Sequence, residues 1–254
     1  MSEPLVFTKN SEFIAWRDSL ATDQKVGLVP TMGALHAGHA ELIKKSAAEN
    51  QVTALTIFVN PTQFNNSEDL QKYPRTWESD LKLASLSGAT AVLSPAFIEI
   101  YPDNYRYKLS ESEFSTKLCG ANRPGHFDGV LTVVMKLLQL ARPHKAYFGE
   151  KDFQQLQLIA DMAKAFFLRT QIGGVPTVRE SDGLAMSSRN VRLTATGREL
   201  APVLFKAISS PTISDARALL DLAKVSPEYL EEHHGRRFIA AQIDGVRLID
   251  NVKL

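Results

Sequence analysis

The chain has 254 residues, enough for one large domain or for a large and a small one. Hydrophobic residues make up 44% of it and charged residues 22%, which is typical of a soluble globular protein. The 29 basic and 28 acidic side chains leave a net charge of +1, so the protein lacks the strong positive field that binds nucleic acid or an anionic membrane non-specifically.

Cysteine content and the N-terminal sequence bear on where the protein works. The single cysteine, Cys119, excludes an internal disulfide bond and a zinc site built from cysteines, and we expect it to be a small buried residue. Residues 1–10 lack the apolar stretch of a signal peptide, and no segment reaches the ~18 apolar residues that span a bilayer. We therefore expect a cytoplasmic protein with neither a membrane nor a nucleic acid as partner.

Short apolar runs alternate with amphipathic stretches along the first two thirds of the chain. In chain order they predict a strand at 26–29, a helix at 39–48, a strand at 52–59, a helix at 75–86, a strand at 89–93, a helix at 129–141, a strand at 146–148, a helix at 152–167 and a strand at 172–178. This alternation indicates βαβ units. It predicts an α/β fold with a Rossmann-like, doubly wound parallel sheet over residues 1–176, and ligands beyond the carboxyl ends of its strands.

The pattern changes after Pro176. Residues 179–190 are polar and irregular, whereas 194–209 and 214–224 have helical spacing. Asp244 and Gly245 separate two apolar runs, which is a strong β-hairpin signal. We therefore expect residues 177–254 to form a small α+β domain that packs over the first domain as a lid.

The sequence His-Ala-Gly-His at 36–39 lies between a predicted strand and a predicted helix. Its two imidazoles, three residues apart at a helix start, fall on one side of the turn. The free N–H groups of a helix N-terminus attract a phosphate, and Gly38 lets the backbone approach it. The pair is suited to stabilising charge on an α-phosphate under attack. Two solvated turn histidines, or a zinc site completed by a further ligand, are the alternatives at this point.

The segment 148–155 again joins a predicted strand to a predicted helix. Gly149 permits a tight turn, and Lys151 can place a positive charge on a phosphate. Asp152 and Gln155 have the spacing of a helix capping box, which is the structural alternative.

Three more polar segments lie at predicted turns. The loop Met-Ser-Ser-Arg-Asn at 186–190 offers two hydroxyls and a guanidinium to triphosphate oxygens, or is a plain surface loop. Asn60 and Gln63, after the predicted strand 52–59, suit a hydroxyl and a carboxylate, and an Asn-Pro turn is the alternative. Arg123 and His126 flank a Pro-Gly turn that either receives a carboxylate or is only a turn.

Seven segments, in this order, closely resemble the pantothenate synthetase (pantoate–β-alanine ligase) family. They are 30–39, 58–64, 73–76, 123–130, 148–155, 183–190 and 247–251. The His-x-Gly-His pair and the Met-Ser-Ser-Arg-Asn loop look like the two ATP signatures of the nucleotidyltransferase superfamily. The resemblance implies an AMP-forming ligase that joins pantoate to β-alanine through a pantoyl-adenylate. It also implies ATP with Mg²⁺, and a homodimer.

The resemblance also implies roles for individual residues. The catalytic residues would be His36, His39, Lys151 and Arg189, with His39 as proton donor. ATP would be bound by Met32, Gly33, Ala34, Leu35, His36, Ala37, Gly38, His39, Gly149, Glu150, Lys151, Asp152, Val178, Met186, Ser187, Ser188 and Arg189. Pantoate would be bound by Gln63 and Gln155, and β-alanine by Gln63, Arg123 and His126. Asp80 would be a neighbour of the Mg²⁺.

The chain departs from longer family members at its C-terminal end, where its domain is shorter by roughly 30 residues. The catalytic segments are intact, so we expect the function to be kept and the lid to be smaller. Another nucleotidyltransferase of the same fold would keep the His-x-Gly-His turn but lack the segments at 60–64 and 149–155. A non-catalytic ATP-binding descendant would not be expected to retain His36, His39, Lys151 and Arg189.

Overall fold

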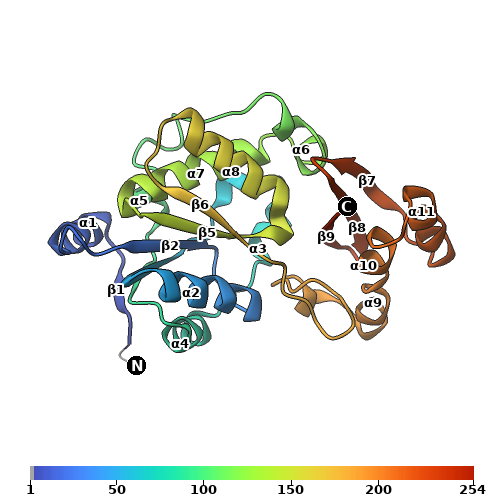
Figure 1. Cartoon of the computed structure of the whole chain (residues 1–254), viewed down its shortest axis with the longest axis horizontal. Helices are drawn as coiled ribbons and strands as arrows, with labels where there is room; N and C mark the ends of the chain where they lie inside the picture. Colours follow the sequence, from blue (N-terminus) through green and yellow to red (C-terminus); the bar gives the residue numbers. More distant parts are fainter. Residues whose placement is uncertain (1–2) are drawn as a thin grey trace.

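A computed structural model describes residues 3–254; Met1 and Ser2, part of the N-terminal stretch considered above, lie outside the described residues. A six-stranded parallel sheet in the order β1-β4-β3-β2-β5-β6 forms the centre of the larger part (Figure 1). Its strands are β1 (Leu5–Phe7), β2 (Val26–Thr31), β3 (Val52–Ile57), β4 (Ala91–Leu93), β5 (Lys145–Gly149) and β6 (Gln171–Val175). The order reverses between β2 and β5, so the predicted doubly wound sheet is confirmed.

Both faces of this sheet are buried by helices (Figure 1). Helices α1 (Asn10–Ser19), α7 (His126–Ala141) and α8 (Phe153–Ala165) cover one face, and α2 (Ala37–Glu49) and α4 (Trp77–Ser87) cover the other. Successive strand residues serve opposite faces: Leu28 packs in the first core and Val29 in the second. This is why strands 26–31 and 52–57 are apolar without alternation.

The connections of this part hold short elements. They are η1 (Pro61–Gln63), α3 (Ser67–Gln71), α5 (Phe97–Ile100), η2 (Phe114–Thr116), α6 (Cys119–Asn122) and η3 (Glu150–Asp152). Cys119 is buried, as expected. Among residues 3–254 no helix is long and apolar enough to cross a membrane.

The C-terminal part has a three-stranded antiparallel sheet with helices packed on it. It comprises η4 (Asn190–Arg192), α9 (Ala195–Leu200), α10 (Val203–Ile208), α11 (Ile213–Leu222), β7 (Pro227–His233), β8 (Arg236–Ile243) and β9 (Val246–Lys253). The predicted hairpin is confirmed, with Asp244 and Gly245 both at positive φ between β8 and β9.

Three details of the elements differ from the sequence prediction. The helix expected over 194–209 is two helices, because Pro202 cannot donate the backbone hydrogen bond that would join them. The strand expected at 172–178 ends at Val175, directly before Pro176. Strands β1 and β7, with helix α1, were not predicted: β1 has three residues, and β7 is polar because it lies at a sheet edge.

Candidate active site

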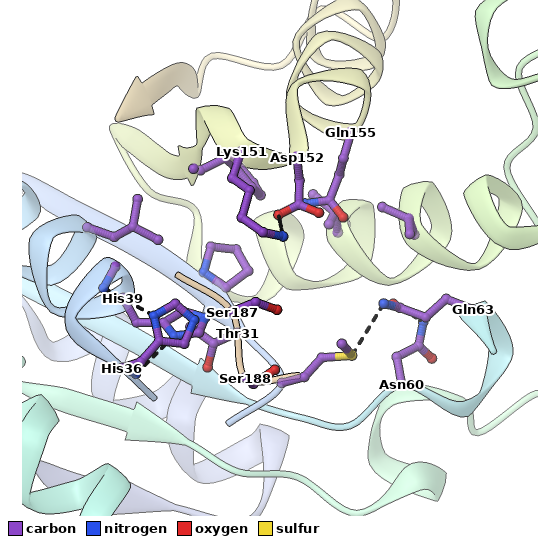
Figure 2. Close-up of a pocket in the computed structure, with 18 of the residues that line it drawn as sticks. Thr31, His36, His39, Asn60, Gln63, Lys151, Asp152, Gln155, Ser187 and Ser188 are labelled. Carbon is purple, nitrogen blue, oxygen red and sulfur yellow. Dashed lines mark hydrogen bonds and ion pairs between the residues drawn. The ribbon is translucent and has the colours of Figure 1, made fainter. Parts of the chain in front are cut away.

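A cavity of about 240 Å³ lies beyond the carboxyl ends of the parallel strands (Figure 2). Pro30 and Thr31 line it from the end of β2, Phe148 and Gly149 from β5, and Val175 from β6. It therefore sits at the switch point between β2 and β5, where the crossovers leave a crevice for a ligand.

Most residues singled out from the sequence line this one cavity. They are Met32, His36, Gly38, His39, Asn60, Gln63, Arg123, His126, Gly149, Lys151, Asp152, Gln155, Val178, Met186, Ser187, Ser188 and Arg189. Five others lie beside it without lining it: Gly33, Ala34, Leu35, Ala37 and Glu150. Segments up to 157 residues apart in sequence (32 and 189) are thus brought together by the fold.

The two histidine rings of the 36–39 turn are in contact at the start of α2, with their planes tilted by 49°. Their ring centroids are 4.1 Å apart. His36 Nδ1 accepts a hydrogen bond from Gly38 N at 3.1 Å, and His39 Nδ1 accepts one from His36 N at 3.3 Å. Since both Nδ1 atoms are acceptors, each neutral ring carries its hydrogen on Nε2. Gly38 is needed for this packing, because a Cβ there would lie 2.9 Å from the His36 ring.

Both imidazoles are neutral near pH 7. Burial, and then Lys151, lowers the pKa of His36 to about 4. Burial, and then the neighbouring His36, lowers the pKa of His39 to about 3. Within residues 3–254 no third His, Cys, Asp or Glu joins the pair, so the zinc alternative lacks its ligands. The pair offers Nε2–H donors without a fixed positive charge.

The turn that leads into this pair is held from behind by Asp80 of α4. The Asp80 carboxylate accepts hydrogen bonds from Ala34 N at 2.9 Å, Leu35 N at 2.7 Å and Thr76 Oγ1 at 2.9 Å. Asp80 is only 2% exposed. Gly33, with φ of +82°, makes the reversal possible. The N–H groups of Ala34 and Leu35 are therefore engaged with Asp80.

The turn between β5 and α8 sends charged side chains into the cavity (Figure 2). Lys151 and Asp152 are 3.7 Å apart, and Lys151 has no closer carboxylate among the described residues. Asp152 is the N-cap residue of α8, but its side chain makes no capping hydrogen bond, so the predicted capping box is absent. Gly149 has ordinary extended φ, and nothing lies within 4 Å of where its Cβ would be. Gly149 therefore leaves open space beside the backbone at the cavity and is not needed for a tight turn.

The two adjacent glutamines of α8 have different environments. Gln154 is buried and bonds to Cys119 N, Phe114 O and Lys117 O, whereas Gln155 lines the cavity. Gln155 is therefore free to meet a ligand, and Gln154 is structural.

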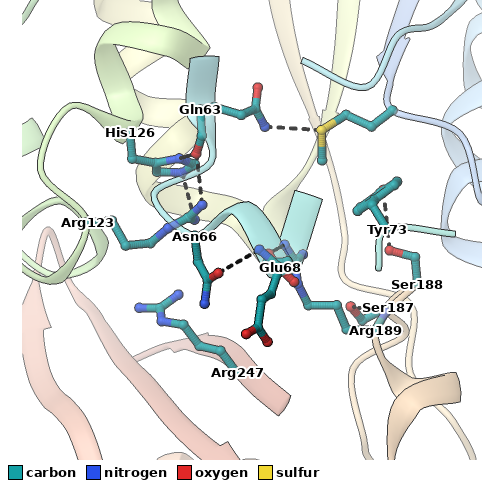
Figure 3. Close-up of polar contacts among 12 residues, drawn as sticks. Gln63, Asn66, Glu68, Tyr73, Arg123, His126, Ser187, Ser188, Arg189 and Arg247 are labelled. Carbon is teal, nitrogen blue, oxygen red and sulfur yellow. Dashed lines mark hydrogen bonds and ion pairs between the residues drawn. The ribbon is translucent and has the colours of Figure 1, made fainter. Parts of the chain in front are cut away.

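On the opposite wall, Gln63 is oriented by its neighbours. Asn60, 1% exposed, donates from Nδ2 to Gln63 Oε1 at 3.0 Å and to Gly129 O at 3.1 Å. The Gln63 carbonyl accepts from Arg123 at 3.0 Å and from His126 Nδ1 at 2.8 Å (Figure 3). Asn60 also lines the cavity, and its side-chain amide orients Gln63. Gln63 Nε2 faces only the weak acceptor Met32 Sδ, at 3.3 Å.

The 186–189 loop lines the cavity and is joined to α3 by an ion pair. Asp69 accepts from Arg189 at 2.9 Å and from Arg192 at 2.7 Å. Burial raises the pKa of Asp69, but the two guanidiniums outweigh it, so the pKa is lowered. Ser188 Oγ lies 3.4 Å from the buried Tyr73 hydroxyl. Asp69 was not singled out from the sequence, because an acidic residue on a short polar helix gives no signal there.

Comparison with known proteins identifies the family. The family model described as pantoate-beta-alanine ligase matches residues 5–253. The pantothenate synthetase of Bdellovibrio bacteriovorus is 55% identical over 250 residues, which cover 98% of this chain and 99% of the relative. The crystal structure of the Francisella tularensis pantoate-beta-alanine ligase, complexed with beta-gamma ATP and beta-alanine, superposes with a TM-score of 0.93 at 40% identity, covering 98% of this chain and 97% of that one.

The chain belongs to the pantoate-β-alanine ligase family. It is thus a ligase, and the resemblance carried by the seven sequence segments is confirmed. A second pantothenate synthetase structure, from Thermus thermophilus, has a TM-score of 0.91 at 35% identity over 98% of this chain. Because the B. bacteriovorus relative is covered over 99% of its length, the short C-terminal part of this ligase is shared with that relative.

Proposed function

We propose that this ligase activates pantoate with ATP and transfers the pantoyl group to β-alanine, forming pantothenate, AMP and pyrophosphate. The observation that carries the proposal is the composition of one cavity at the sheet's switch point. There the neutral His36–His39 pair and Lys151 face the amide side chains of Gln63 and Gln155. Such a site offers donors to phosphates on one side and to a hydroxy acid on the other.

The first step makes pantoate a competent acyl donor. A carboxylate transfers its acyl group poorly, because its leaving group would be an oxide. Its oxygen attacks the α-phosphorus of ATP, the bond to the β-phosphate oxygen breaks, and pyrophosphate leaves with that electron pair. His36 and His39 donate from Nε2 to the α-phosphate, and Lys151 and Arg189 neutralise the developing charge. Gln63 and Gln155 hold pantoate in line.

The second step uses the mixed anhydride. The neutral amine of β-alanine attacks the acyl carbon, the bond to the phosphate oxygen breaks, and AMP leaves with that electron pair. The nitrogen then loses its extra proton to solvent. Arg123 and His126 lie on the Gln63 side of the cavity. Burial, together with the smaller effects of the cations Arg247 and Arg189, lowers the pKa of Arg123 to about 10. The guanidinium is still charged near pH 7 and is poorly compensated, so it would attract a carboxylate. We assign the β-alanine carboxylate to this side.

Mg²⁺ fits this site as a partner of ATP. Within residues 3–254 no three acidic or histidine side chains converge, but Mg²⁺ commonly needs only one or two carboxylates beside phosphates and waters. Asp152 lines the cavity and is half-exposed, so it is the carboxylate available to hold the ion. When bound, Mg²⁺ would neutralise phosphate charge. Asp80, with both oxygens engaged behind the turn, is better suited to bracing than to metal binding.

We also propose that residues 1–176 bind ATP and pantoate and that residues 177–254 act as the lid, in the cytoplasm. The lid assignment is supported by the 186–189 loop, which lines the cavity from the C-terminal side. A homodimer is supported by the edge strand β1, where Leu5 and Val6 are 55% and 44% exposed. Sedimentation equilibrium would test the dimer.

The decisive experiment measures AMP formation by the purified chain. We expect AMP only when ATP, pantoate and β-alanine are all present, and pyrophosphate release from ATP and pantoate alone. Replacing His39 with alanine should lower pyrophosphate release by on the order of 10²-fold, as loss of one transition-state donor does. AMP formation that does not depend on pantoate, or an unaffected His39→Ala enzyme, would contradict the proposal.

A further inference from the structure

Asn251, on the last strand, reaches the turn that carries Lys151. The residue is 2% exposed. Its side-chain Nδ2 donates to two successive carbonyls, Glu150 O and Lys151 O, each at 2.9 Å. Both carbonyls belong to η3, which has only three residues. The Asp152 side chain makes no capping hydrogen bond that would stabilise this turn. One amide group of β9 therefore fixes a turn about 100 residues earlier in the chain.

The orientation of this amide is set by Arg236 on the neighbouring strand. Arg236 Nε donates to Asn251 Oδ1 at 2.6 Å, which requires oxygen on that side and nitrogen facing the turn. Arg236 is itself held by the Phe153 ring, 4.3 Å from its guanidinium carbon, and by Glu150 at 3.6 Å. Every polar atom of the Asn251 side chain is thus paired, and a buried network paired in this way is rigid.

The preceding residue, Asp250, connects β9 to the segment that leads into the 186–189 loop. Asp250 accepts from both terminal nitrogens of Arg179, at 2.6 and 3.0 Å, and from Asn251 N at 2.8 Å. Arg179 also donates to Gly183 O, and it pairs with Ala185 just before the 186–189 loop. Two consecutive residues of β9 thus hold the turn and the loop against one another.

We propose that Asn251 is a positioning residue for Lys151 and Asp152. It does not line the cavity, so it acts through the two carbonyls rather than on a substrate. Its amide holds the turn so that the Lys151 ammonium stays over the phosphate side of the cavity. The inference rests on the proposed function, since it assigns Lys151 to ATP.

The first test replaces Asn251 with aspartate, which keeps the volume but turns a donor pair into an acceptor facing two carbonyl oxygens. We expect kcat/KM for ATP in pyrophosphate release to fall by on the order of 10²-fold, since displacements of about 1 Å cost that much. The KM for pantoate should change less than threefold. The matched control is Asn104→Asp, the same substitution at an exposed residue, and it should behave as wild type.

A merely structural role is separated by a double-mutant cycle with Lys151→Ala. If Asn251 acts through Lys151, Asn251→Ala should lower kcat/KM for ATP by tenfold or more in the wild type and by less than threefold in the Lys151→Ala background. Equal losses in both backgrounds would overturn the proposal, as would a folded Asn251→Asp enzyme with kcat/KM for ATP within twofold of wild type. Melting curves show which variants are folded.

The dissociation constant of ATP, measured by calorimetry on the same variants, separates this inference from the proposed function. A wild-type chain that forms no AMP from the three substrates would contradict the function. The ATP constants would then decide the positioning role alone: at least tenfold weaker binding by Asn251→Asp supports it, and unchanged binding overturns it.

Discussion

The Asp80→Asn substitution tests how the His36–His39 turn is held. Asp80 lies on α4, which follows β3 in the chain. Its carboxylate accepts hydrogen bonds from the N–H groups of Ala34 and Leu35. An asparagine fits the same space but has one oxygen. In either orientation its NH₂ group faces a backbone N–H, so one buried donor is left without an acceptor.

The expected effect follows from those contacts. An unpaired buried donor costs about 1–3 kcal/mol, and the surviving hydrogen bonds lose the charge that strengthened them. We expect the free energy of unfolding to fall by about 2–4 kcal/mol, which for a chain of this size is a drop of roughly 5–15 °C in melting temperature. Displacement of the turn moves both imidazoles, so pyrophosphate release should fall by on the order of 10²-fold.

Calorimetric melting and pyrophosphate release, measured on the same preparations, check both parts. The control is Thr76→Val, which removes only the hydroxyl hydrogen bond to Asp80 and should cost about 1 kcal/mol. If Asp80→Asn melts like wild type and regains activity when Mg²⁺ is raised, Asp80 is a metal ligand and the bracing argument is refuted.

Four further predictions concern other parts of the site. Gln155→Leu should raise the KM for pantoate by tenfold or more with little change in the KM for ATP; equal changes would indicate a fold defect. Burial and Arg123 lower the pKa of His126 to about 3, whereas in the unfolded chain it is about 6.5. Between these two pH values the unfolded state binds one more proton than the folded state, so the free energy of unfolding should fall as the pH drops from about 6.5 towards about 3. The fall in melting temperature between pH 7 and pH 5 should therefore be smaller for His126→Gln than for the wild type. Asp69→Asn frees Arg189 from its half-buried partner and should lower the KM for ATP by about two- to fivefold, whereas a raised KM would mean that Asp69 preorganises the arginine. With ATP and pantoate but no β-alanine, the small lid should allow slow continuous pyrophosphate release; one burst near one equivalent, with no later phase, would show that it seals the intermediate from water.

The local elements were predictable wherever the apolar pattern was long. The strands at 26–31 and 52–57, the helix at 126–141 and the Asp244-Gly245 hairpin all follow from residue order, because burial on a fixed face imposes a fixed period. Short edge elements such as β1 and β7 were missed, since an edge strand buries little and so carries little pattern.

The sequence by itself determined the family, the sheet type and most of the polar segments that line the cavity. It could not decide which polar groups face a ligand and which hold one another. Gln154 and Gln155 are adjacent and identical in kind, yet one bonds to backbone groups and the other lines the cavity. Likewise the Asn60 amide donates its hydrogen bonds to Gln63 and Gly129. The Asp80 carboxylate accepts hydrogen bonds from the turn before α2. A buried polar side chain takes whichever partners the packed chain brings within hydrogen-bond distance. Those partners can be 100 residues away in sequence, as for Asn251 and Lys151. Only the tertiary structure sets those distances.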